Sequence, residues 1–75
     1  MSDKSISEVK FALQNLLMDK LGLGAQTHMN TIDDTKDKAS LAAAVTKITT
    51  ALDASKKADA SKALTTLWTN LRTKL

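Results

Sequence analysis

The 75-residue chain contains no cysteine, no proline and no tyrosine, and it has only two glycines, one phenylalanine and one tryptophan. Without cysteine there are no disulfides, no thiolate metal ligands and no cysteine nucleophile. The lack of proline and the many Ala, Leu and Lys residues favour helices, while a hydrophobic content of 43% argues against a disordered chain. We therefore predict one all-α domain spanning residues 1–75.

Long hydrophobic runs are also missing from the sequence. The longest uninterrupted apolar run, Leu41 to Val45, is far shorter than the roughly 20 residues that a membrane-spanning helix needs. The amino terminus has no cationic segment followed by an apolar one, so it does not resemble a signal peptide. We expect a cytoplasmic protein with no membrane partner.

Groups that perform catalysis or hold metals are scarce, since the chain has one His and one Glu. No recognised catalytic motif accompanies them. The best candidate metal ligands are His28, Asp33, Asp34 and Asp37. Their spacing matches no known metal site, and aspartates before a helix are better explained by the helix dipole. The sequence predicts a protein that is not an enzyme and uses no cofactor or metal.

Apolar periodicity predicts a small bundle of about three helices, at residues 5–21, 34–54 and 59–74. Residues 22–33 show no clear period and are predicted to form a long loop between the first two helices. The second helix has a regular apolar stripe of Leu41, Val45, Ile48 and Leu52. A straight helix through residues 34–74 would bring its two apolar stripes about 120° out of phase, so a turn is expected near residues 55–57.

Local signals place the ends of these helices. Ser5 and Glu8 fit a capping box at the start of the first helix, and Gly22 suits the left-handed residue that follows its end. The second helix is expected to begin near Asp34. Either Ser55 or Asp59 is expected to cap the third helix.

The first helix is apolar on two opposite sides. Its main stripe contains Ile6, Val9, Leu13, Leu16 and Leu17. Phe11 and Met18 lie together on the far side, with neutral polar neighbours, and Leu21 lies between the two sides. This composition resembles the centre of a protein–protein contact. In the alternative, the 22–33 segment folds back and covers Phe11 and Met18 through Leu23, Met29 or Ile32.

The single tryptophan, Trp68, lies at the flank of the third helix's apolar stripe. This position favours packing in the core or at its rim, and contact with a partner is a second interpretation. The candidate partner-binding residues are therefore Phe11, Met18, Leu21 and Trp68.

Charge is unevenly distributed along the chain. Residues 1–38 carry five Lys against six acidic residues, a net charge of −1, and residues 39–75 carry six basic residues against two Asp, a net charge of +4. A nucleic-acid-binding function would use the basic residues Lys56, Lys57, Lys62, Arg72 and Lys74. A single arginine offers few contacts for recognising base edges. Solvated lysines on the surface of a helical bundle are the simpler explanation of these basic residues.

The leading hypothesis is a non-enzymatic protein-interaction module, such as an inhibitor, adaptor or assembly subunit, which binds another protein or a second copy of itself through the first helix. Nucleic-acid binding is the first alternative. A filament or shell subunit that packs through its threonine-rich helix backs is the second. The sequence carries no specific family resemblance, and its likeness in composition to small regulators and phage-encoded accessory proteins is an analogy only.

Overall fold

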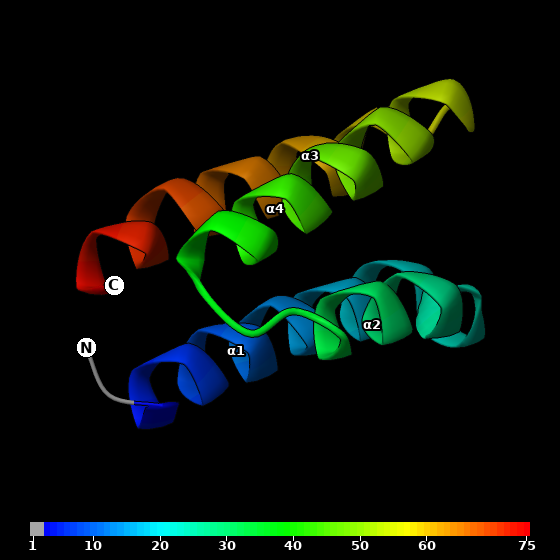
Figure 1. Ribbon diagram of the computed structural model, residues 1–75. Helices are drawn as coiled ribbons and strands as arrows, with labels where there is room; N and C mark the ends of the chain where they lie inside the picture. Colours follow the sequence, from blue (N-terminus) through cyan, green and yellow to red (C-terminus); the bar gives the residue numbers. More distant parts are fainter. Residues whose placement is uncertain (1–2) are drawn as a thin grey trace.

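The computed structural model describes residues 3–75, and all regular structure in that range is helical (Figure 1). The long helices are α1 (Asp3–Leu21), α3 (Lys38–Ala54) and α4 (Ala58–Leu71). A 3-10 turn, η1 (Gly22–Ala25), joins α1 to the short helix α2 (Gln26–Asp33), and a second one, η2 (Arg72–Lys74), extends α4. Helices α1 and α2 form one antiparallel layer, and the α3–α4 hairpin forms the other. The predicted all-α class is confirmed.

The long loop predicted over residues 22–33 is wrong. Gly22 adopts a φ of 60° and ends α1 as expected, but the chain continues directly into η1 and α2. Ala25 and Ile32 are fully buried and Met29 is partly buried, so the spacing of four and three residues is a helical stripe. The other α2 residues, such as Thr27 and Asn30, have weak helix propensity. Packing against α1 and α3 therefore stabilises α2 more than local preference does.

A lysine of α1 anchors the carboxyl end of α2. The Nζ of Lys10 donates to the carbonyl oxygens of Asp33 at 3.0 Å and Thr35 at 2.7 Å. This places a positive charge at the negative end of the helix dipole. Thr35 is itself buried, and its Oγ1 donates to the carbonyl of Ile32 at 2.6 Å. These contacts fix α2 against the middle of α1.

Two predicted helix starts need correction. The described part of α1 already includes Asp3, so Ser5 and Glu8 lie inside the helix rather than at its start. Helix α3 begins at Lys38 rather than near residue 34, because a capping box forms one turn later than expected. The Asp37 carboxylate accepts from the Ser40 N–H at 2.8 Å, and the Ser40 hydroxyl accepts from the Asp37 N–H at 3.1 Å.

The turn between α3 and α4 lies where the sequence predicts it. The Lys57 N–H donates to the Leu52 carbonyl at 2.8 Å and the Lys56 N–H to the Asp53 carbonyl at 3.2 Å. With Lys56 at a φ of 61°, these bonds form a Schellman motif. The expected capping of the third helix by Ser55 or Asp59 is wrong, because Lys57 is the N-cap of α4 and makes no side-chain cap bond.

The core lies between the two layers. Its largest fully buried side chains are Leu13, Leu17, Ile32, Leu41, Ile48, Leu52 and Leu64. The stripes predicted for the long helices therefore face inward, and Ile32 adds a contribution from α2. The buried Ser61 hydroxyl donates to the Thr49 carbonyl at 3.4 Å and links α4 to α3. In the described part of the chain, every buried side-chain nitrogen and oxygen has a hydrogen-bond partner.

Candidate functional site

The candidate site is the outer face of α1, defined by Phe11 and Met18. Phe11 is 65% exposed and Met18 is 43% exposed. The two residues are seven positions apart, which places them about 20° from each other around the helix and about 10 Å apart along it. Ser7 and Asn15, both exposed, share this face. The second apolar side expected from the sequence thus faces solvent in the structure.

Helix α2 packs beside this outer face and leaves it open. The Gln14 side-chain N–H donates to the Met29 carbonyl at 3.0 Å. Gln14 lies on the flank of α1 beside Phe11 and Met18, so α2 contacts that flank. Ile32 points into the core and Met29 is only partly buried against it. The 22–33 segment therefore does not cover Phe11 and Met18 as the alternative interpretation required.

The other two candidate partner-binding residues lie elsewhere. Trp68 is only 8% exposed and belongs to the core, so it forms no part of an exposed contact surface. Leu21 is half-buried against the core at the end of α1. The first interpretation of Trp68, as a packing residue, agrees with its position.

Leu23 is a surface residue, although the alternative interpretation of the sequence used it to cover Phe11 and Met18. It is 93% exposed at the turn from α1 into α2. Its two neighbours, Gly22 and Gly24, are the only glycines of the chain, and a leucine between two glycines is the signal that could have marked an exposed turn. Phe11, Met18 and Leu23 are the exposed large hydrophobic side chains of the described residues, and the pair Phe11 and Met18 is called the apolar ridge below.

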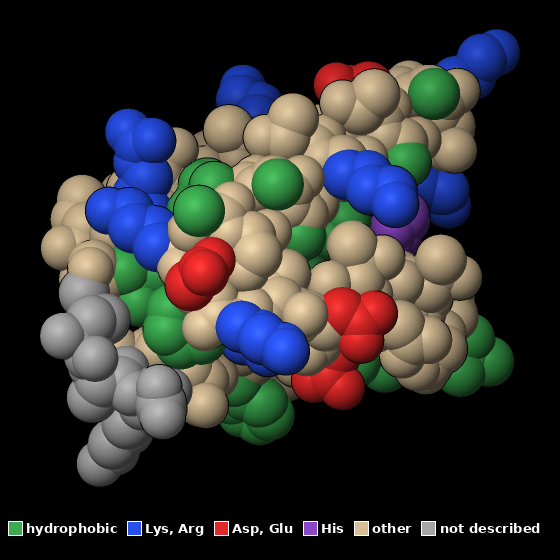
Figure 2. Space-filling view, in the orientation of Figure 1, with side chains coloured by type: hydrophobic (Ala, Val, Ile, Leu, Met, Phe, Trp, Pro, Cys, Tyr) green, Lys and Arg blue, Asp and Glu red, His purple; other side chains and the backbone are tan. Residues whose placement is uncertain are grey.

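Acidic residues border the apolar ridge. Glu8 and Asp19 are exposed on one flank of α1, at about 60–100° from Phe11 and Met18. On the other flank, the bond from Lys10 to the Asp33 carbonyl brings the exposed Asp33 close to α1. Figure 2 shows acidic side chains next to hydrophobic ones along the edge formed by α1 and α2. The surroundings of the ridge therefore hold both acidic side chains and the Lys10 ammonium.

The basic residues considered for nucleic-acid binding are exposed but do not form one patch. Lys56 and Lys57 lie at the α3–α4 turn, while Arg72 and Lys74 lie in η2 at the opposite end of α4. Lys57 and Arg72 are fifteen positions apart, which separates the two groups by about 22 Å along the helix. Lys62 is exposed between them.

The threonine-rich backs of α3 and α4 are mostly exposed, and several of their hydroxyls bond within their own helix. Thr50 Oγ1 donates to the Thr46 carbonyl of α3 at 2.9 Å, and Thr73 Oγ1, in the η2 turn that extends α4, donates to the Asn70 carbonyl of α4 at 2.9 Å. These hydroxyls already have a partner in the single chain. They give no specific indication of packing in a filament or shell.

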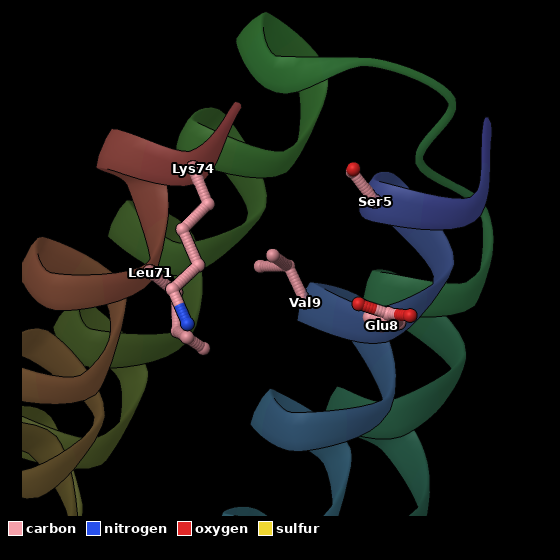
Figure 3. A pocket seen from close by; sticks show the side chains of 5 residues that line it. All are labelled: Ser5, Glu8, Val9, Leu71 and Lys74. Carbon is pink, nitrogen blue, oxygen red and sulfur yellow. The ribbon is translucent and has the colours of Figure 1, made fainter. Parts of the chain in front are cut away.

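A shallow pocket separates the first turns of α1 from the carboxyl end of α4 (Figure 3). It has a volume of about 120 Å³ and is lined by Ser5, Glu8, Val9, Leu71 and Lys74. Ligand pockets usually measure roughly 300–1,000 Å³, so this one is too small for most cofactors. Among the described residues, no group of three or more His, Asp or Glu side chains could hold a metal ion.

Comparison with known proteins gives no further direction, because no family model, curated protein or solved structure matches the chain. Within residues 3–75, none of the helices combines the length and the apolar character needed to cross a membrane. The function must therefore be inferred from the surface of this chain alone.

Proposed function

We propose that this protein is a non-enzymatic interaction module that binds another protein chain through the outer face of α1. One observation carries the proposal: Phe11 is 65% exposed beside Met18, and neither η1 nor α2 covers them. Fully burying a side chain such as Phe or Met is worth about 1.5–3 kcal/mol relative to leaving it exposed. The two residues would therefore act as the anchors of the contact.

The contact must extend beyond these anchors. A stable protein–protein interface buries about 1,200–2,000 Å² in total, far more than two side chains provide. The neutral, exposed residues Asn15, between the anchors, and Ser7, one turn before Phe11, extend the available surface. Such a surface, apolar at its centre and polar at its rim, is typical of protein contacts.

The test is the double variant F11S/M18S. Sedimentation over a concentration series measures self-association, and quantitative mass spectrometry identifies proteins retained from a cell lysate. We expect the associated mass or the retained proteins of the wild type to be lost in F11S/M18S. The matched control is A43S/A51S, which places serine at two exposed positions of α3 and should behave like the wild type.

Circular dichroism must show that all three proteins are helical. If F11S/M18S is folded and has the same associated mass and the same retained proteins as the wild type, the proposed function is wrong.

A further inference from the structure

The pocket between α1 and the carboxyl end of α4 borders the apolar ridge and indicates how a partner is held, an inference that rests on the proposed function. The pocket is lined from three elements, by Ser5, Glu8 and Val9 of α1, Leu71 of α4 and Lys74 of η2. Glu8 is three positions before Phe11, so the two residues are neighbours one turn apart on the surface of α1. The pocket therefore begins where the ridge ends.

Helix α2 lies on the opposite flank of α1 from the pocket. Glu8 and Gln14 are each about 60° from Phe11, in opposite directions around the helix. Gln14 donates to the Met29 carbonyl of α2 at 3.0 Å, whereas Glu8 lines the pocket. A partner that extends from the ridge past Gln14 meets α2, and a partner that extends past Glu8 reaches the pocket. The pocket side is therefore open to the larger contact that the proposed function requires.

The pocket combines apolar walls with two side chains of opposite charge (Figure 3). Val9 is only 3% exposed and Leu71 is half-buried, while Glu8 and Lys74 are exposed. For an ionic group in the pocket, attraction to one of these charges is offset by repulsion from the other. Burial of such a group against Val9 and Leu71 also costs hydration. A neutral apolar side chain meets neither cost, so the lining favours it.

We propose that the pocket receives one neutral apolar side chain of the partner protein, while neighbouring side chains of that partner cover Phe11 and Met18. A cavity of roughly 150 Å³ holds one benzene molecule, so a pocket of about 120 Å³ has room for one side chain of the size of Leu or Met. A free ligand usually occupies roughly 300–1,000 Å³, which is more than this pocket offers. An anchor side chain that fills a small pocket is a common centre of binding energy in protein contacts.

A displayed library of random 16-residue peptides tests the proposal and does not require the natural partner. The library is selected on the full chain and then depleted on F11S/M18S, so that only peptides dependent on the ridge remain. Their affinities are measured by fluorescence anisotropy for the wild type and for two variants that circular dichroism shows to be helical. Ser5→Leu fills the pocket, and the matched control Ser5→Ala leaves it open. We expect Ser5→Leu to weaken binding about tenfold or more and Ser5→Ala to bind nearly as well as the wild type.

Each enriched peptide should have one apolar residue that enters the pocket. Replacement of that residue by Ala, Lys or Glu should weaken binding to the wild type and have little effect on the remaining binding to Ser5→Leu. A second measurement needs no variant of the protein. In NMR spectra of the wild type, peptide binding should shift the backbone N–H signals of Val9 and Leu71 and leave those of the α3–α4 turn unchanged.

Three results would overturn the pocket inference while the proposed function stands. Ser5→Leu binds the peptides like the wild type or no more weakly than Ser5→Ala, the Val9 and Leu71 signals do not shift, or the peptide residue that is sensitive to Ser5→Leu is charged. If no peptide depends on Phe11 and Met18, the proposed function fails as well.

Discussion

Replacement of Ile32 by alanine tests whether α2 is a docked helix or a surface connection. Ile32 is fully buried in the core shared with α1 and α3. Truncation of a buried isoleucine to alanine costs about 2–5 kcal/mol, and the better helix propensity of alanine returns only a few tenths. We expect Ile32→Ala to lower the free energy of unfolding by about 2–4 kcal/mol, a large share of the stability of a small domain.

The measurement is a urea titration followed by circular dichroism. A domain of this size loses about 1 kcal/mol of stability per molar urea, so the midpoint should fall by about 2–4 M. Ile32→Val should cost only about 0.5–1.5 kcal/mol, and Leu23→Ala, at a 93% exposed position, less than about 0.5 kcal/mol. A loss below about 1 kcal/mol for Ile32→Ala would refute the packing of α2 into the core and support a loop.

Three further predictions follow from single contacts. Lys10→Met removes two hydrogen bonds to carbonyls at the end of α2 and should lower the free energy of unfolding by about 1 kcal/mol in the urea titration. The control Lys20→Met, at an exposed position, should change the stability little, and equal effects of the two variants would contradict the anchoring role of Lys10. Lys56→Gly relieves a φ of 61° and should raise stability by about 0.5–1 kcal/mol, and a loss of stability would count against the Schellman geometry. The backbone N–H of Ser40 and then its side chain lower the pKa of Asp37 below 3.8, so the stability that Asp37 contributes is complete above that value and is lost as the pH falls through its folded pKa. The difference in urea midpoint between the wild type and Asp37→Asn should therefore shrink as the pH falls below 3.8, and a difference that grows would reverse the sign of this linkage.

The long helices could be predicted because their local signals agree with their packing. The apolar period of Leu41, Val45, Ile48 and Leu52 matches the buried face of α3. Gly22 ends α1 where predicted, and the turn at residues 55–57 is found because one straight helix could not bury both stripes. In these segments, periodicity alone specifies the buried side.

Helix α2 could not be predicted in the same way, because eight residues with weak helix propensity carry too short a pattern. What stabilises it comes from other elements, namely the core against which Ile32 packs and the Lys10 ammonium and Gln14 amide of α1. Capping boxes can also be misplaced, since the pair Ser5 and Glu8 has the right spacing but lies inside α1, whereas Asp37 and Ser40 form the true box. The spacing of two residues indicates a candidate cap. Whether that cap lies at a helix end depends on the backbone conformation of the residues before it.

The exposure of the outer face of α1 depends on this same short helix. The wheel positions of Phe11 and Met18 were readable from the sequence, but their exposure depended on the direction in which residues 22–33 return. A loop of that length could have covered them. A helix anchored by Lys10 and Gln14 instead lies along one flank of α1, and its buried stripe points to the core. The same contacts that stabilise α2 therefore keep the apolar ridge open and bring Asp33 to its border.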